Sequence, residues 1–220
     1  MTQQARQHRE SEPKLEDLGL DPTMFRDAAS RGLDSALSRT GFANPGAQSN
    51  DLYQDLSEDI RRRLGRMGWT VGTVNNQRRI VHPDGLLAIV VTAAKNVGVV
   101  GDPLLVPVTT PKGPVTRKSI DRYNRLTGQG FFQFDGVPDP VRADPDELAA
   151  AAPLWFLMHH LVGRTLLLEL AEPIGYRPTS GKVDTWGRRF PIDPISFDED
   201  DGFPDDTEGP ADLDIPITRR

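Results

Sequence analysis

The residues best suited to chemistry in this sequence are basic and lie between positions 109 and 125. Five cations stand in this stretch: Lys112, Arg117, Lys118, Arg122 and Arg125. Such groups bind phosphate when no carboxylate neutralises them, and aromatic rings that could stack on bases lie nearby: Trp69, Tyr123, Phe131 and Phe132. The stretch predicts contact with DNA or RNA, without a readable helix-turn-helix or RNA-binding motif. The alternative is that these cations pair with acids from elsewhere in the chain.

A metal-dependent nuclease is a second possibility for chemistry. Asp84 precedes an apolar strand and Lys95 lies just after it, and a nuclease would use the lysine to orient the attacking water. Its Mg²⁺ would also need a second acid on the neighbouring strand. Ala93 and Ala94 stand before Lys95 instead, and Asp84 belongs to a Pro-Asp-Gly turn, where aspartate is common. Of the nucleases, the sequence is therefore compatible only with a degenerate or unusual one.

Histidine chemistry has little support. His159 and His160 are adjacent, so they point to opposite faces of a strand and do not share a metal easily. Glu169 could meet one of them across a hairpin, while His82 and Asp84 would share a face only if the strand continued through Pro83. We therefore expect no catalytic residue, no metal site and no cofactor.

Composition limits the class of protein. Apolar residues make up 37% of the 220 residues, and there is no cysteine, which excludes disulfides and thiolate zinc sites. The N-terminus lacks the apolar segment of a secretory signal, and no apolar run is long enough to cross a membrane. These features predict a cytoplasmic protein with no membrane partner.

Charge is distributed unevenly along the chain. Between Arg61 and Arg125 there are twelve basic and three acidic residues, a balance of +9. From Asp193 to the end there are ten acidic residues and two arginines, a balance of −8. An acidic tail beside a basic domain can compete with nucleic acid for the same surface.

Two amphipathic helices precede the strands. The first is expected over residues 22–40, with Asp21 as N-cap and Pro22 at its first position. Its apolar face either docks on its own domain, which we favour, or fits a groove on a protein partner. The second is expected over residues 51–67, where three consecutive arginines are partly paired with acids one turn earlier.

The strands follow as a meander. Strands are predicted at residues 69–74, 78–82 and 86–93, the last being continuously apolar and so a central strand buried on both faces. A loop should cover residues 95–121, with a short helix beginning near Thr116, and another helix should begin at Asp144. Residues 154–171 fit either one helix or a hairpin, and alternation of apolar residues favours the hairpin. A further strand is expected at residues 181–186.

Three stretches together carry a family resemblance: WTV…RRIVHPDGLLAIVV, TTPKGPVTRKSI and LLLELAEPI…GKVDTWGRRFPIDPI. They resemble uncharacterised proteins of actinobacterial phages, plasmids and integrative elements, in which a strand, an NPKGPAT-like loop and an ELSLP…W.ERI.LP-like ending recur in this order. The resemblance covers about residues 51–195 and departs from the pattern at TTPKGPVT and LELAEP. It implies a mobile-element setting, favours the hairpin, and carries no catalytic residue.

The sequence thus predicts one α+β domain over residues 51–195, with an antiparallel or mixed sheet packed on an amphipathic helix. Residues 1–50 form a flexible arm with one helix, and residues 196–220 an acidic disordered tail. The expected function is that of a non-enzymatic accessory protein that contacts nucleic acid. The alternative is a protein-binding module or inhibitor that acts through residues 22–40 and the tail.

Overall fold

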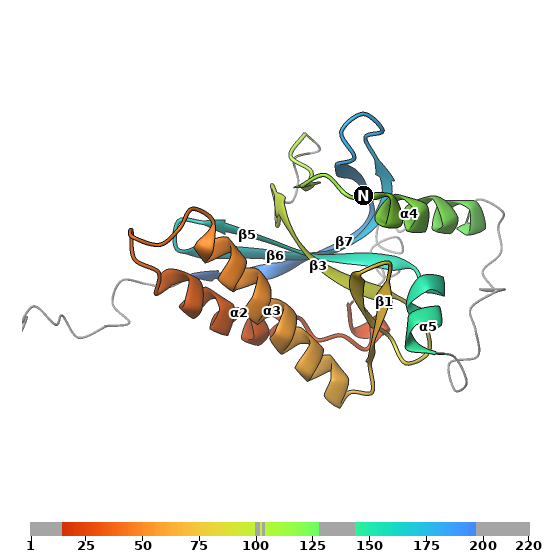
Figure 1. Cartoon of the computed structure of the whole chain (residues 1–220), viewed down its shortest axis with the longest axis horizontal. Helices are drawn as coiled ribbons and strands as arrows, with labels where there is room; N and C mark the ends of the chain where they lie inside the picture. Colours follow the sequence, from red (N-terminus) through yellow and green to blue (C-terminus); the bar gives the residue numbers. More distant parts are fainter. Residues whose placement is uncertain (1–14, 100–101, 103, 128–143, 197–220) are drawn as a thin grey trace, which may run out of the picture.

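The computed structural model describes residues 15–99, 102, 104–127 and 144–196. It is an α+β structure in which a mixed seven-stranded sheet carries helices on both faces (Figure 1). This arrangement confirms the fold class expected from the sequence. The predicted acidic tail beyond Ser196 and the phenylalanines of residues 131–134 lie outside the described residues.

A pair of helices covers one face of the sheet. After a 3₁₀ turn at Leu15–Leu18, the two long helices are α2 (Pro22–Leu37) and α3 (Ala47–Arg66). Asp21 caps α2 as predicted, because its carboxylate accepts the Thr23 backbone N–H at 2.8 Å. The apolar side chains of α2 are fully buried: Phe25, Ala28, Ala29, Leu33 and Ala36.

The apolar face of α2 is occupied by its own chain. Its buried residues belong to the same core as α3 and the sheet, and Gly32 brings the two helices close together. A Cβ at Gly32 would lie only 3.1 Å from the carbonyl oxygen of Leu52 on α3. The helix therefore docks on its own domain, which is the arrangement that the sequence favoured over docking on a partner.

The strands form one sheet in the order β1-β2-β3-β5-β6-β7, and the short β4 pairs with the end of β3. Their bounds are β1 (Thr70–Val74), β2 (Gln77–Val81), β3 (Ala88–Lys95), β4 (Val108–Thr109), β5 (Leu154–Val162), β6 (Thr165–Tyr176) and β7 (Val183–Ser196). Neighbouring strands are antiparallel except β3 and β5, which are parallel. A parallel pair needs a long crossover, and here it contains β4, α4 and α5.

Two predictions about strands are confirmed. β3 lies between β2 and β5, with Ile89 and Val91 in the core under α2 and α3, and Val90 and Ala94 in the opposite core. Residues 154–171 form a hairpin, because β5 and β6 pair antiparallel down to Val162 and Thr165. The turn between them contains Gly163 at a φ of 59°, a conformation that glycine adopts without strain.

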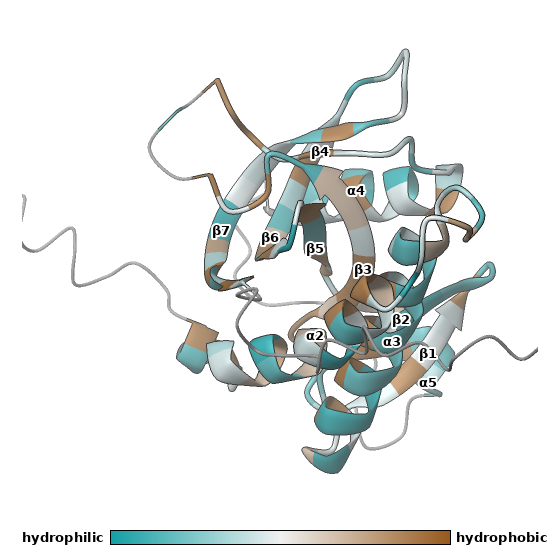
Figure 2. Ribbon diagram, turned by 90° about the vertical axis from the view of Figure 1, so that its left-hand side faces the viewer, coloured by the Kyte–Doolittle hydropathy of each residue, from teal (hydrophilic) through white to brown (hydrophobic). Residues whose placement is uncertain are grey.

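The helices α4 (Pro114–Thr127) and α5 (Pro145–Ala151) cover the other face. Ile120 of α4 packs in a core with Leu154 and Phe156 of β5. α5 lies against β1 at Gly72, where a Cβ would stand 2.1 Å from the carbonyl oxygen of Pro145. Figure 2 shows the sheet curving between α2 and α3 at one end and β4 and α4 at the other.

Candidate functional site

Helix α4 carries most of the cations that the sequence singled out. It begins at Pro114, which suits the first position of a helix because its missing N–H would be unpaired there. The helix is longer than the sequence predicted, and its inner side presents Thr116 and Ile120, which are 2% and 1% exposed. Lys118 and Arg125 are exposed, so α4 turns a basic side away from the sheet.

Three of the five predicted residues share one face of α4. Lys118, Arg122 and Arg125 are spaced i, i+4 and i+7, which stacks them along one side of a helix. The Arg122 guanidinium donates to the carbonyl oxygen of Ala150 at 3.0 Å, where α4 meets α5. Within the described ranges, none of these three cations forms an ion pair with a carboxylate. We call this surface the α4 basic face.

The other two predicted residues do not belong to this face. Arg117 is half-buried, and its guanidinium lies 5.9 Å from the centre of the Tyr176 ring on β6, a cation–π arrangement. The Tyr176 hydroxyl donates to Asp121 at 3.1 Å, so the acid of α4 is held on that same side. Lys112 turns inward from the loop before α4.

The Lys112 amine is surrounded by neutral groups. Its Nζ donates to the Thr92 hydroxyl on β3 and to the Thr110 hydroxyl at 3.1 Å. The Phe156 ring of β5 lies below it, 5.9 Å from Nζ to the ring centre. No carboxylate among the described residues pairs with it. Burial lowers the pKa of Lys112 to about 8, because the charged ammonium loses hydration.

The backbone of the loop is fixed from three sides. The Lys112 N–H donates to the Gly181 carbonyl at 2.8 Å, and the Val183 N–H donates to the Thr109 hydroxyl at 3.1 Å. The Trp186 indole donates to the Pro107 carbonyl at 2.8 Å. Gly181 has a φ of 67° and would bring a Cβ to 3.1 Å from the Lys112 carbonyl oxygen. The turn before β7 therefore holds the loop in one position.

Arg79 is a second buried cation, and sequence reasoning missed it. It is fully buried on β2, and its guanidinium donates to Gln77, to the Ala149 carbonyl of α5 and to the Ser119 hydroxyl of α4, at 2.8–3.0 Å. Burial lowers the pKa of Arg79 to about 10. A signal was present, because two adjacent arginines in a strand must point to opposite faces, so either Arg78 or Arg79 had to point inward.

Two buried carboxylates of β6 hold β7. Glu169, fully buried, accepts from Arg189 in bidentate fashion and from the Gly98 backbone N–H at 2.8 Å. It therefore does not meet a histidine, contrary to the possibility raised by the sequence. Glu172 accepts from Arg188 at 3.0 Å. Burial of Tyr123 and its bond to Glu172 raise the tyrosine pKa to about 12. These contacts are structural.

The three described histidines, His82, His159 and His160, lie in surroundings that the structure defines. In the part of the chain that the structure describes, no group of three or more histidine, aspartate or glutamate side chains could hold a metal ion. His82 Nδ1 accepts the backbone N–H of Asp84 at 3.0 Å, which makes this pair part of a turn. Burial lowers the pKa of His159 to about 4, with smaller contributions from the charges of His160 and Lys112.

The residues of the nuclease alternative lie far apart. Asp84 stands before the start of β3 and Lys95 at its end. The eight residues of β3 advance about 3.3 Å each, so more than about 20 Å separates the two positions. The geometry does not bring together an acid and a lysine for metal-dependent hydrolysis at this place.

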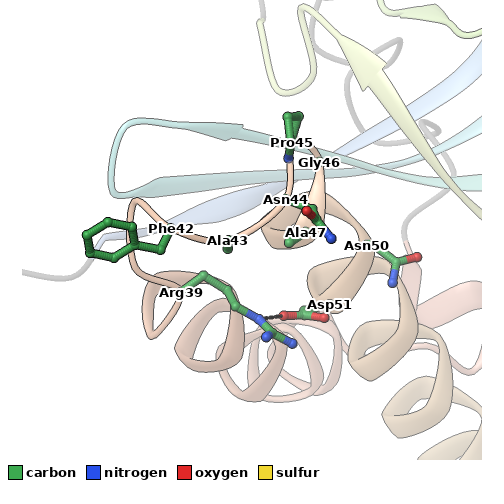
Figure 3. Close-up of a pocket in the computed structure, with 9 residues that line it drawn as sticks. All are labelled: Arg39, Phe42, Ala43, Asn44, Pro45, Gly46, Ala47, Asn50 and Asp51. Atoms are coloured by element: carbon green, nitrogen blue, oxygen red, sulfur yellow. Dashed lines mark hydrogen bonds and ion pairs between the residues drawn. The ribbon is translucent and has the colours of Figure 1, made fainter.

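The turn between α2 and α3 forms an open polar hollow, shown in Figure 3. An ion pair between Arg39 and Asp51 closes one side of it. Phe42 points away from the turn and is fully exposed. This hollow has no buried polar group directed into it among the labelled residues, and we assign it no chemistry.

Comparisons with known proteins add no family: no family model, no curated protein and no solved structure matches the chain. Among the described helices, none has the length and apolar character required to cross a membrane.

Proposed function

We propose that the protein is a non-enzymatic accessory protein of a mobile element that contacts nucleic acid through the α4 basic face. The observation that carries this proposal is the alignment of Lys118, Arg122 and Arg125 on one side of α4, without a carboxylate partner among the described residues. Cations in such a row attract phosphates spaced along a strand, and the interaction releases counterions. The mobile-element setting follows only from the sequence resemblance.

The structure changes which residues carry the proposed interface. Lys112 and Arg117 point toward Thr92 and Tyr176 and so leave the interface. Arg122 donates only one of its N–H groups to a backbone carbonyl, so the three cations of the α4 basic face remain for phosphate. Three phosphate contacts correspond to a salt slope of about −2.7 for duplex DNA. Binding of this kind is non-specific in sequence and weak, with a Kd on the order of 10⁻⁴ to 10⁻⁶ M at physiological salt.

A salt titration tests this proposal. Binding of the full chain to a labelled duplex and to a labelled single strand is measured by fluorescence anisotropy at salt concentrations from about 20 to about 200 mM. The variant K118Q/R122Q/R125Q should lose most of the affinity and of the salt slope. The control R31Q/K95Q/R66Q removes three exposed cations from α2, β3 and α3 and matches the net charge. Equal losses in the two variants, or no binding at low salt, would reject the α4 basic face.

Protein binding is the competing function, and the exposed Phe42 favours it. The apolar face of α2 is buried in the core, so a partner would have to contact the turn between α2 and α3 instead. In that case F42S would abolish cross-linking to the partner, while K118Q/R122Q/R125Q would leave it unchanged. If instead K118Q/R122Q/R125Q loses binding to nucleic acid and F42S keeps it, the result supports the first proposal.

A further inference from the structure

Among the lysines that the structure describes, Lys95 and Lys118 are exposed, whereas the Lys112 amine is held against neutral groups. Its Nζ lies between two threonine hydroxyls and over the Phe156 ring, and no described carboxylate compensates its charge. A lysine that serves only solubility extends into water, and one that serves only stability is usually paired with an acid. The Lys112 amine neither extends into water nor pairs with an acid among the described residues.

The loop holds this amine in a fixed place that solvent still reaches. The backbone of Lys112 is bonded to Gly181, while Thr110 beside its Nζ is exposed. Lys112 as a whole is only partly buried, so part of its side chain faces water. A small molecule can therefore approach the amine along the Thr110 side.

We propose that Lys112 is a reactive amine that condenses with small aldehydes to form an imine. The Nζ lone pair attacks the carbonyl carbon, and a C–N bond forms while the C=O electrons move to oxygen. The nitrogen then loses its two protons, the oxygen receives two and leaves as water, and a C=N bond remains. Nothing is oxidised or reduced in this step.

The neighbouring groups favour this reaction. Only the neutral amine is a nucleophile, and burial without an acid partner shifts the pKa of Lys112 to about 8. At pH 7 about 10% of such an amine is neutral, against about 0.03% of an ordinary lysine. The titratable neighbour on β5, His159, is neutral at this pH because its pKa is lowered to about 4. The Thr110 hydroxyl, 3.1 Å from Nζ, can donate to the carbonyl oxygen.

The proposal is tested by trapping the imine. The full chain is incubated with acetaldehyde and cyanoborohydride at several pH values from 6 to 10, digested with a protease that does not cut at lysine, and labelling of each lysine is followed by mass spectrometry. The neutral fraction of Lys112 at pH 7 is about 300 times that of an ordinary lysine, and the lower basicity and partial burial of the amine reduce this advantage. Lys112 should therefore be alkylated about tenfold faster than Lys118 at pH 7, with an inflection near pH 8. A rate no greater than that of Lys118, or an inflection near pH 10, would overturn the proposal.

Two variants separate reactivity from folding. Thr92→Val removes one acceptor of the ammonium with little change in shape, so the inflection should move to lower pH and alkylation at pH 7 should accelerate. Lys112→Arg keeps the charge and should remove only the fast-reacting site, leaving the rates of the other lysines unchanged. If Thr92→Val leaves the Lys112 profile unmoved, the hydroxyl environment does not control the amine and the proposal fails.

Discussion

Replacing Lys112 by methionine is expected to stabilise the protein at neutral pH. The ammonium is half-buried and bonded only to neutral hydroxyls, and its pKa falls from 10.5 in the unfolded chain to about 8 in the folded one. A shift of this size corresponds to about 3 kcal/mol. Solvent access to the half-buried side chain reduces the effect, and we expect Lys112→Met to gain about 1–2 kcal/mol in the free energy of unfolding at pH 7.

The pH dependence has a defined sign. Between pH 8 and 10.5 the unfolded chain binds a proton at Lys112 that the folded chain has released, so wild-type stability rises with pH in this window. The advantage of Lys112→Met should therefore be present at pH 7 and disappear toward pH 10. Arg79 and Tyr123, whose pKa values are about 10 and about 12, occur in both proteins and cancel in the difference.

Urea unfolding followed by tryptophan fluorescence at pH 7, 8, 9 and 10 measures this difference. Lys118→Met is the control, because Lys118 is exposed on α4 and its replacement should change stability by less than about 0.5 kcal/mol. A loss of stability in Lys112→Met at pH 7, or an advantage that stays constant with pH, would refute the argument that the lysine is uncompensated.

Three further predictions concern the scaffold. Gly72→Ala should destabilise by about 1–3 kcal/mol, because its Cβ would overlap the Pro145 carbonyl, whereas Gly65→Ala on the open side of α3 should be neutral or stabilising in the same urea assay. Glu169→Gln should cost about 2–4 kcal/mol at pH 7, since it leaves the partly buried Arg189 charge without its carboxylate; a change below about 1 kcal/mol would contradict this. His159→Leu should remove up to about 3 kcal/mol of the rise in stability between pH 4 and 6.5, because the folded histidine titrates near pH 4 and the unfolded one near 6.5; unchanged slopes would contradict this.

Much of the fold could be predicted because it depends on local periodicity. The cap at Asp21, the stripe of α3, the continuous apolar run of β3 and the alternation in β5 and β6 are each visible within a short window of sequence. The ends of elements were less accurate: α3 begins at Ala47 rather than residue 51, and β7 runs from Val183 to Ser196 rather than ending near residue 186. For β7, pairing with the neighbouring strand β6 extends the strand beyond its local sequence signal.

The site could be predicted only in part, because burial of a charge depends on distant segments. Lys118, Arg122 and Arg125 follow from helical spacing alone. The inward turn of Lys112 depends on Gly181, which is about seventy residues away, and nothing near Lys112 in the sequence encodes that contact. The pairing of Glu169 with Arg189 is equally non-local, since it requires the register of β6 against β7.

Arg79 and Lys112, both turned inward without a carboxylate partner among the described residues, should respond in opposite ways to loss of charge. Arg79 ties β2 to both α4 and α5 through Ser119 and Ala149, so Arg79→Met would leave their buried acceptors unpaired and should cost about 2–4 kcal/mol. The Lys112 ammonium donates hydrogen bonds only to two threonine hydroxyls, and the backbone of its loop is held independently of the side chain. The fold thus needs the charge of Arg79 and tolerates loss of the charge of Lys112, which leaves Lys112 available for chemistry. Urea unfolding of Arg79→Met beside Lys112→Met tests this contrast, and two shifts of the same sign would show that the amine is as structural as the guanidinium.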